Sequence, residues 1–431
     1  MEKEPEEKTK SEIAYDTHVR DLARALSYHI ARGKAMGEKG ETVDFGFSQV
    51  QFNCRDGETN HVYHGTNQQL LSYVLSINGD WNGETRWFTQ ECAERRGYKF
   101  KNGMKIAGCG IVCGLGEQRN NNGPFFKGDP EADPDKYLDD VIEGEKGSDQ
   151  LKKRVIVFNA ALFKGIEPDF ELERRLKKKS RLFQDEFDKE EVARLRFLTA
   201  ALVVSGPAKV SFSPAVPDPY FNKNRNEIVI PNEVRFGGTD GSLSTVEAYR
   251  LMFSHLVHET AHSTSTPLNR KVDLNYGSPE YAQEELIAQL TSVTVSERML
   301  GANIAGRNTK VDDFSAMYIN TWAERVGDLD YFEHVVRESD KAGNHILASL
   351  RKNLKALDPE FHLAFESGND MEKRIQNLAD RFPASQDFKV PLQDLAQSVR
   401  DGIDDANAEK AAREASRQAD REIGQDDGPD F

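Results

Sequence analysis

The residues of this chain best suited to chemistry are two histidines and a glutamate in one short stretch, His258, Glu259 and His262. On a helix, positions i and i+4 lie on one face about a turn apart, so both imidazoles can bind one tetrahedral ion. The glutamate between them can polarise a metal-bound water and transfer its proton. Apolar residues before the motif favour a helix, and Pro267 favours its end. This spacing is typical of zinc-dependent peptidases.

A third protein ligand is expected from the next predicted helix. Glu285 lies 23 residues after His262, and Gln289, one turn further on, can hold a ligand in place through a hydrogen bond. Three protein ligands leave the fourth position of the ion open to water, as a catalytic site requires. The neighbouring Glu284 is the alternative ligand. We prefer Glu285 because it gives the pattern Glu-x-x-Ala-polar, with Ala288 at the fourth position.

Other interpretations of these residues are open. The two histidines can be core residues beside a surface salt bridge, or they can form a metal site that has lost catalysis. His255 precedes His258 by three positions on the same predicted helix, and it can be a ligand, support a ligand or simply pack. Tyr220, in a Pro-rich segment ahead of a predicted strand, is a candidate for stabilising an oxyanion, with packing as its alternative role.

A second candidate site is the segment 86–105, where cations alternate with aromatic residues. Cations that follow a phosphate backbone and aromatic rings that stack on bases are features of sequence-tolerant single-strand binding. The alternative is that the aromatic residues belong to the core and the charges to an ordinary surface. The candidate nucleic-acid-binding residues are Arg86, Trp87, Arg95, Arg96, Lys99, Lys101 and Lys105, with Tyr63 and Asn67 on the same surface.

Hydrophobic periodicity predicts the elements that position these residues. Strands are expected at Lys105–Leu115, Val155–Asn159, Lys209–Phe212 and Glu227–Ile230. Helices are expected at Ile13–Met36, Thr89–Gly97, Glu190–Ser205, Ser244–Ser263, Glu280–Met299, Val311–Arg325 and Leu329–Leu357. The predicted fold class is α+β, with a small mixed α/β N-terminal nucleic-acid-binding domain followed by a mainly helical peptidase domain.

Composition along the chain predicts the domain boundaries. Residues 13–165 form the N-terminal domain, with an insertion loop at 117–153 that is rich in Gly, Asn and Asp. A charged linker at 166–189 leads to the peptidase domain at 190–357 and a helical extension at 358–400. Residues 1–12 and the acidic tail 401–431 contain few large apolar residues. Residues 1–12 are predicted to be disordered, and the tail is predicted to be either disordered or an unattached helix.

Charge and cysteine content narrow the class of protein. The net charge of −15 argues against nucleic-acid binding by the whole surface but allows a local basic groove. The cysteines, Cys54, Cys92, Cys109 and Cys113, do not form a disulfide framework for a chain of this length and favour a reducing compartment. There is no apolar run long enough to span a bilayer and no hydrophobic leader. We therefore expect a cytoplasmic protein without a membrane partner.

The motifs together resemble those of the ArdC-type antirestriction proteins of conjugative plasmids. The resemblance covers residues 14 to about 350 in the same order. It rests on HETAHSTSTPLNR (258–270), YAQEELIAQL (281–290) and YFNKNRNEIVIPNEVRF (220–236), and in the N-terminal half on VYHGTNQQLL (62–71), RWFTQECAERRGYKFKNGMK (86–105) and VFNAALFKGIE (157–167). Such proteins pair an N-terminal single-stranded DNA-binding domain with a C-terminal zincin-like metallopeptidase domain.

The resemblance implies a specific function. We expect a zinc-dependent metallopeptidase fused to a single-stranded DNA-binding domain, which protects incoming mobile-element DNA from restriction. Zn²⁺ is the expected ion, with Mn²⁺ as the alternative. The expected partners are single-stranded DNA and an unidentified protein substrate. The rival hypothesis is a non-catalytic, DNA-binding decoy protein whose metal site is structural or vestigial.

Overall fold

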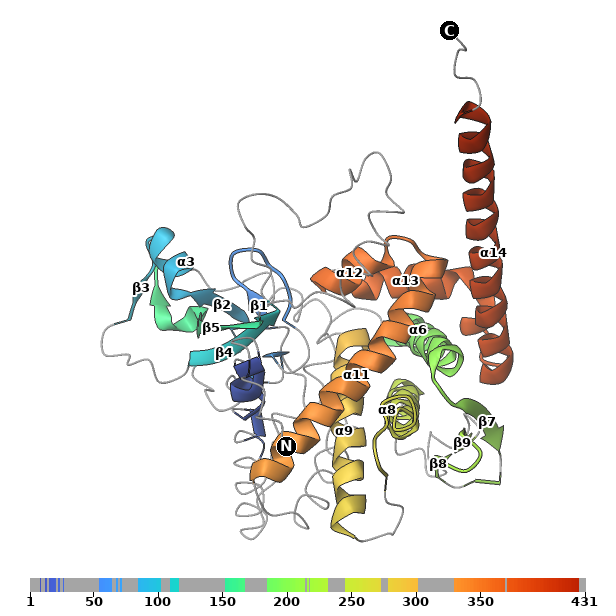
Figure 1. Ribbon diagram of the computed structural model, residues 1–431, viewed down its shortest axis with the longest axis horizontal. Coiled ribbons are helices and arrows are strands. Elements are labelled where there is room, and N and C mark those ends of the chain that lie inside the picture. The colour runs from blue at the N-terminus through green and yellow to red at the C-terminus, as the bar shows by residue number, and fades with distance from the viewer. Residues whose placement is uncertain are drawn as a thin grey trace, which may run out of the picture.

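The computed structural model of this chain has an α+β fold, as predicted, with helices in the majority and three small sheets (Figure 1). The residues that the structure describes are 8, 12–13, 15–20, 22–23, 26, 54–63, 67–68, 70–71, 84–101, 109–115, 152–166, 184–213, 215–216, 218–231, 245–272, 278–300, 329–368 and 370–425. The predicted helix at 311–325, most of the insertion loop 117–153, most of the linker 166–189 and Lys105 lie outside this part of the chain.

The N-terminal part contains two sheets. The larger has the strand order β1–β2–β5–β4, with β1 parallel to β2 and the other pairs antiparallel. Its strands are β1 (Arg55–Asp56), β2 (Arg86–Thr89), β4 (Cys109–Leu115) and β5 (Lys152–Asn159). The smaller sheet pairs β3 (Lys99–Phe100) with β6 (Phe163–Lys164). The strand β5 begins at Lys152, inside the range that had been predicted as an insertion loop.

A short helix follows β2 for local reasons. Helix α3 (Gln90–Arg95) begins after Thr89, whose hydroxyl accepts a hydrogen bond from the amide of Cys92 and so caps the first turn. Gly97 follows the helix with a φ of +76°, which glycine adopts without the steric cost that other residues meet. The single turn η2 (Ala160–Leu162) connects β5 to β6 and is capped by Asn159 in the same way. The cap at Thr89 and the turn at Gly97 lie at the two ends of α3, so the helix is shorter than the predicted range Thr89–Gly97.

The C-terminal part is a helical bundle against a small sheet. The sheet has the order β7–β9–β8, formed by β7 (Lys209–Ser213), β8 (Tyr220–Asn222) and β9 (Glu227–Pro231). The helices are α6 (Gln184–Ser205), α8 (Thr245–Ser263), α9 (Pro279–Leu300), α11 (Leu329–Leu357), α12 (Phe361–Ser367), α13 (Met371–Arg381) and α14 (Leu392–Gln425), with the single turn η4 (Pro383–Ser385) before the last. The predicted helices and strands within the described residues agree with these bounds to within a few positions.

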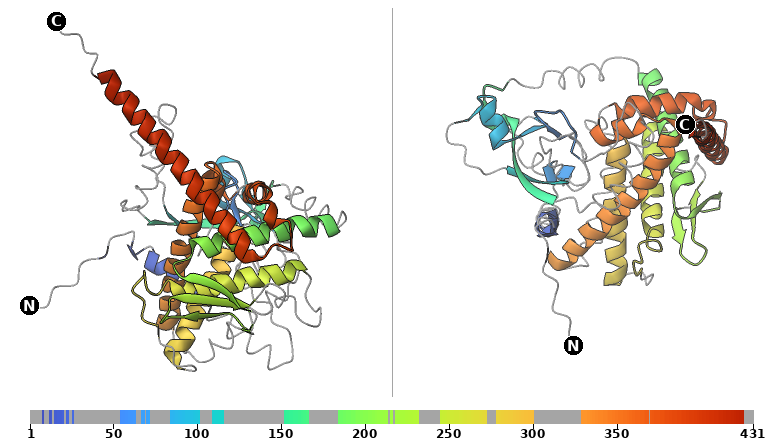
Figure 2. Two further views of the ribbon diagram at one scale, coloured as in Figure 1. Left: turned by 90° about the vertical axis from the view of Figure 1, so that its right-hand side faces the viewer. Right: turned by 45° about the horizontal axis from the view of Figure 1, so that its top comes forward.

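The last helix includes most of the predicted tail. Residues 401–425, for which disorder and an unattached helix were the two predicted alternatives, continue helix α14. The helix packs on the body through side chains up to Ile403 and then extends away from it, as Figure 1 and the left view of Figure 2 show. Ion pairs one turn apart, such as Arg413 with Glu409, support the exposed part of the helix. Among the described residues, no helix is both long and apolar enough to cross a membrane.

Helix α9 lies between the two parts of the molecule (Figure 1). One side of it shares a core with helices α6, α8 and α11 through Ala288, Val295 and Met299. The other side of α9, with Leu286 and Leu290, belongs to a second core. This core also contains residues of β2 and β5 and of the N-terminal helical segment, which is the part described between residues 12 and 26. The N-terminal part therefore shares a core with the helix that carries the predicted third ligand, and α11 contributes Phe332, Val335 and Val336 to the same core.

Polar contacts reinforce this packing along α11. The hydroxyl of Tyr15 donates to the Asp340 carboxylate at 2.9 Å, and Arg337 pairs with Asp16 at 2.8 Å. The guanidinium of Arg337 also lies over the Tyr15 ring. These contacts hold the N-terminal segment against α11 beside the shared core.

Shortening Leu290 to alanine should destabilise the whole protein, because this side chain is 3% exposed within the shared core. We expect Leu290→Ala to lower the free energy of unfolding by about 2–5 kcal/mol, measured by urea denaturation. Ile13→Ala is the control, since Ile13 is 53% exposed and its loss should change stability by no more than about 0.5 kcal/mol. Equal effects of the two substitutions would contradict the shared core.

Candidate metal centre

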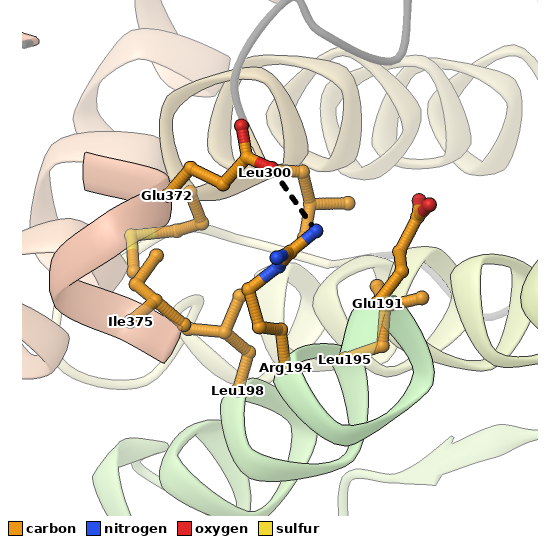
Figure 3. Close-up of a pocket in the computed structure, with 8 residues that line it drawn as sticks. Glu191, Arg194, Leu195, Leu198, Leu300, Glu372 and Ile375 are labelled. Atoms are coloured by element: carbon orange, nitrogen blue, oxygen red, sulfur yellow. Dashed lines mark ion pairs between the residues drawn. The ribbon is translucent and has the colours of Figure 1, made fainter. Parts of the chain in front are cut away.

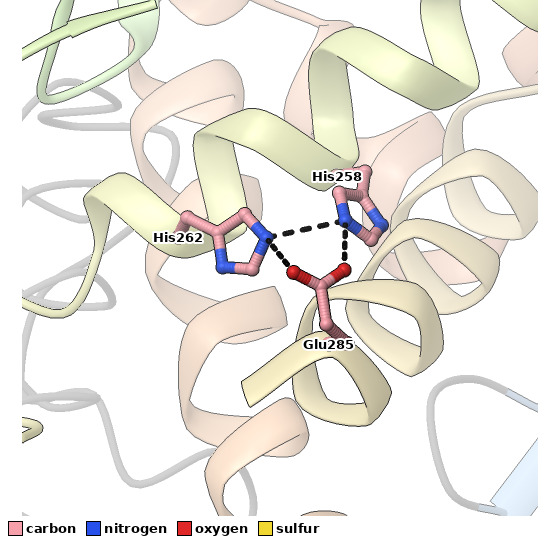
Figure 4. A group of neighbouring side chains, drawn as sticks. All are labelled: His258, His262 and Glu285. Carbon is pink, nitrogen blue, oxygen red and sulfur yellow. Dashed lines mark hydrogen bonds and ion pairs between the residues drawn. The ribbon is translucent and has the colours of Figure 1, made fainter. Parts of the chain in front are cut away.

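Helix α8 brings the two histidines of the motif together. Its apolar residues Phe253, Leu256 and Val257 are fully buried, which fixes the rotation of the helix about its axis. His258 and His262 then lie one turn apart on the same side, each 9% exposed. Their Nε2 atoms are 3.2 Å apart (Figure 4).

Glu285 of helix α9 completes a group of three ligands (Figure 4). One carboxylate oxygen lies 3.4 Å from His258 Nε2, and the other lies 3.7 Å from His262 Nε2. Ligands around a tetrahedral ion at the usual zinc distances are about 3.4 Å from one another. The three donors therefore have the spacing that such an ion requires. Among the described residues, no other cluster of histidine, cysteine and carboxylate side chains meets the same criterion.

Each histidine has a partner on its other ring nitrogen. His258 Nδ1 lies 3.2 Å from Gln289 Oε1, and His262 Nδ1 lies 3.0 Å from Glu284 Oε1. If each Nδ1 donates its proton to this acceptor, each Nε2 keeps a lone pair for an ion. Gln289 lies beside His258, one turn along α9 from Glu285. Glu284, which was the alternative ligand, faces the far side of His262 instead of the three-ligand group.

Arg270 is a site residue that the sequence reasoning missed. Its Nε and Nη2 donate to the two oxygens of Glu284 at 2.8 and 2.7 Å. Nη2 also donates to the carbonyl of Ala261 at 2.9 Å. The chain reaches this position through a turn in which Asn269 has a φ of +52°. No spacing rule connects an arginine in such a turn with a glutamate of the next helix, so the sequence contained no signal for the contact.

Electrostatics around His262 favour a positive charge at the site. Burial by itself lowers the pKa of His262, but the hydrogen bond to Glu284 and the charges of Glu285, Glu284 and Glu259 raise it to about 9. Burial raises the pKa of Glu284, and its bonds to His262 and Arg270 outweigh that effect and lower it. An ion that binds at His262 must therefore displace a proton near neutral pH. The group attracts a cation, whether that cation is a proton or a metal ion.

The remaining residues predicted for this site are not among the three possible ligands. Glu259 is partly buried and makes no hydrogen bond or ion pair with the residues that the structure describes. His255 is not in the group, and burial together with the neighbouring His258 lowers its pKa to about 4. Tyr220 begins the edge strand β8, which packs against α8, and its side chain is 45% exposed.

A pocket at the other end of helix α9 is separate from this group. It lies between α6, α9 and α13 and contains an ion pair of Arg194 with Glu372 at 3.2 Å (Figure 3). Its lining includes Met299, which is about 21 Å along the helix from Glu285. The rest of the lining is Glu191 and the apolar side chains of Leu195, Leu198, Leu300 and Ile375, and these described residues form no second cluster of metal ligands.

The structure divides the predicted nucleic-acid-binding residues into core and surface. Trp87 is 0% exposed and packs in the N-terminal core, so our prediction that it contacts nucleic acid is wrong. Arg86 forms a two-point ion pair with Glu84. Arg95 pairs with Glu58 at 2.6 Å, and Arg96 lies 4.0 Å from the same carboxylate.

Other members of the set lie on or near the surface. Lys99 and Lys101 are exposed on and beside β3, whereas Tyr63 and Asn67 are partly buried. Lys99 is directly opposite Lys164 in the register of β3 and β6. The rings of Phe100 and Phe163 stack 4.5 Å apart within the same two-stranded sheet. The aromatic residues described in this segment thus serve mainly as core, while Lys99 and Lys101 are at the surface.

Comparison with known proteins identifies the C-terminal domain. Residues 200–330 match the family described as zincin-like metallopeptidase, so this part of the chain is a zincin-like domain, as the motif predicts. A crystal structure of the antirestriction protein ArdC from a plasmid, in its Mn(II)-bound form, is similar to this chain. The two are 16% identical, with a TM-score of 0.41, and the match covers 75% of this chain and 97% of that one. A search of curated proteins found no match.

The three-ligand group predicts how metal content responds to substitution. The wild-type chain should hold one divalent ion, and His258→Ala and His262→Ala should each lose it, as measured by elemental analysis after dialysis. Glu285→Gln should lose more metal than Glu284→Gln, because only Glu285 lies within reach of both Nε2 atoms. A full equivalent of metal in both histidine variants would show that the ion binds elsewhere.

Proposed function

We propose that this chain is a metal-dependent peptidase of the ArdC antirestriction type, which also binds single-stranded DNA. The observation that carries the peptidase proposal is the buried group of His258, His262 and Glu285, with Glu259 next to it on the same helix. Three protein ligands leave one position of a tetrahedral ion for water, which distinguishes catalytic from structural zinc sites. The match of residues 200–330 to zincin-like metallopeptidases supports the same reaction class.

The charges of the site fit a divalent cation. The carboxylates of Glu259, Glu284 and Glu285 all act on His262, and one guanidinium, that of Arg270, binds Glu284. With neutral histidines, this set has two negative charges in excess. Burying such an excess without compensation is costly, and a divalent ion compensates it fully. Zn²⁺ suits the nitrogen and oxygen donors, and Mn²⁺, the ion of the similar ArdC crystal structure, is the alternative.

The residues of the chain have distinct roles in the proposed reaction. A bound divalent ion would act as a Lewis acid that lowers the pKa of a coordinated water and polarises the peptide carbonyl. Glu259 takes the proton of the attacking water and returns it to the leaving amine. Gln289 and Glu284 keep the imidazoles oriented throughout, because each accepts a hydrogen bond from an Nδ1 atom. Tyr220, on the edge strand beside α8, is a candidate donor to the oxyanion.

Replacing Glu259 by glutamine tests the catalytic role. A general base contributes roughly 10²–10⁴-fold to the rate, so Glu259→Gln should abolish cleavage while metal content and melting temperature stay unchanged. Glu280→Gln is the control, since Glu280 is an exposed glutamate in the first turn of the ligand helix α9. The Glu259→Gln variant should also retain the substrate, which a metal-loaded pull-down can identify. A retained partner that the wild-type protein fails to cleave would favour the non-catalytic decoy.

The DNA-binding proposal rests on the exposed cations around β3. Lys99 and Lys101 are exposed, and Lys164 faces Lys99 across the two-stranded sheet. Like charges directly opposite one another destabilise a sheet, and a bound phosphate would relieve that repulsion. Arg95 can also contribute, because exposed ion pairs such as its contact with Glu58 are worth at most about 1 kcal/mol and can exchange for a phosphate.

Charge reversal at β3 should weaken the binding of single strands. We expect the double substitution Lys99→Glu and Lys101→Glu to reduce the affinity for an unstructured oligonucleotide and to flatten its dependence on salt, measured by fluorescence anisotropy. Lys389→Glu is the matched control, because Lys389 is exposed on the C-terminal part of the chain. Binding that is absent in the wild-type protein at low salt, or equal in all three proteins, would contradict the assignment.

A further inference from the structure

Arg270 connects the two helices that supply the metal ligands. It follows α8 by seven residues, and its guanidinium contacts the last turn of that helix through the carbonyl of Ala261 and the hydroxyl of Thr264. The same guanidinium holds Glu284 of α9 through two hydrogen bonds. The Arg270 side chain is 4% exposed, so these contacts are shielded from water. Shielded, two-point contacts of this kind are both strong and geometrically specific.

Glu284 and Glu285 are neighbours on α9, and a contact such as that of Arg270 is needed to hold one of them away from the ligand position. Glu284 and Glu285 are both 4% exposed, and both lie beside His262. Either carboxylate has the chemistry of a metal ligand, and a buried anion without a partner would move toward a nearby cation. Both oxygens of Glu284 are occupied by Arg270, and one of them also accepts the hydrogen bond from His262. This arrangement leaves Glu285 alone to face the two Nε2 atoms.

We propose that Arg270 is a positioning residue that assigns different roles to the two glutamates. It holds Glu284 as the hydrogen-bond acceptor of His262 Nδ1 and so leaves Glu285 as the third ligand. By contacting the end of α8 as well, it fixes the distance between the two ligand helices. This role rests on the metal site of the proposed function and adds to it the residue that determines the ligand set.

Arg270 and Glu284 should act as one unit in metal binding. Residues that support a metal ligand typically contribute 10–100-fold to affinity, and we expect Arg270→Gln to weaken zinc binding by roughly that factor, measured by competition with a chelating dye. Arg270→Lys keeps the charge but loses the two-point contact, so its effect should be intermediate. Glu284→Gln combined with Arg270→Gln should weaken binding no further than the stronger single substitution, because both remove the same interaction.

Arg250 provides a matched control. It lies on α8, and its ion pair with Glu191 of α6 is buried like that of Arg270. Arg250→Gln should lower the melting temperature but leave zinc affinity at the wild-type value. The absorption spectrum of the cobalt-loaded protein gives a second readout, since Arg270→Gln should alter the ligand set and hence the visible bands, whereas Arg250→Gln should not.

The outcomes separate this role from the proposed function. If the wild-type protein binds zinc and Arg270→Gln binds it equally well, with an unchanged cobalt spectrum, the positioning role is wrong and the metal site stands. If Arg270→Gln and Arg250→Gln lower zinc affinity alike, Arg270 serves stability only, and the role is again overturned. If the wild-type protein binds no ion, both the proposed function and this role are wrong. If Arg270→Gln does not fold, the zinc affinity and cobalt spectrum of Arg270→Lys and of Glu284→Gln are each compared with those of Arg250→Gln. The same outcomes then support or overturn the positioning role.

Discussion

The burial of helix α9 is the constraint on which the rest of the structure depends. Every residue from Glu284 to Val295 is buried, although this stretch contains two carboxylates, an amide and several hydroxyls. A polar group inside a protein is tolerated only when it has a partner. Ser292 and Thr291 find backbone carbonyls on α8 and α11. The carboxylates find imidazoles and a guanidinium, so the candidate metal centre lies where the helix would otherwise bury unpaired charge.

This constraint explains why the ligands belong together as a set. Glu285 faces both histidines, Glu284 bridges His262 and Arg270, and Gln289 faces His258. Gln289 and Glu284 each have a hydrogen-bonded partner, so the removal of either one leaves a buried polar group without that partner. Such networks are worth more than the sum of their pairs and define one geometry. A single fixed geometry of the side chains suits a metal site, because its donor atoms must keep their spacing within narrow limits.

The position of α9 also links the two halves of the chain. Its Leu286 and Leu290 side chains complete the N-terminal core, and its Ala288 and Val295 complete the C-terminal one. Close-packed interiors transmit displacement, because they contain few voids that can absorb it. The N-terminal core and Glu285 are therefore connected through the same helix. In a protein proposed to bind DNA with one half and hydrolyse a protein with the other, this packing gives the two sites a physical connection.

The sequence by itself determined the elements and the ligands that lie close together in the chain. His258 and His262 are one turn apart whenever residues 245–263 are helical, so local spacing was sufficient to predict their meeting, and the helix bounds followed from hydrophobic period. The pattern after Glu285 likewise placed Gln289 one turn further along α9.

Only the tertiary structure decided the contacts between segments. Glu284 and Glu285 are equivalent in composition and neighbours in sequence, and the rotation of α9 against α8 determines which of them faces the Nε2 atoms. The bond of Arg270 to Glu284 has the same origin. Trp87 is an example in which the sequence pattern gave the wrong answer. Alternating aromatic and basic residues look the same in the sequence whether a strand presents its rings to DNA or buries them in the core. Local periodicity is a property of the chain, whereas the partner of a side chain depends on which distant surface packs against it.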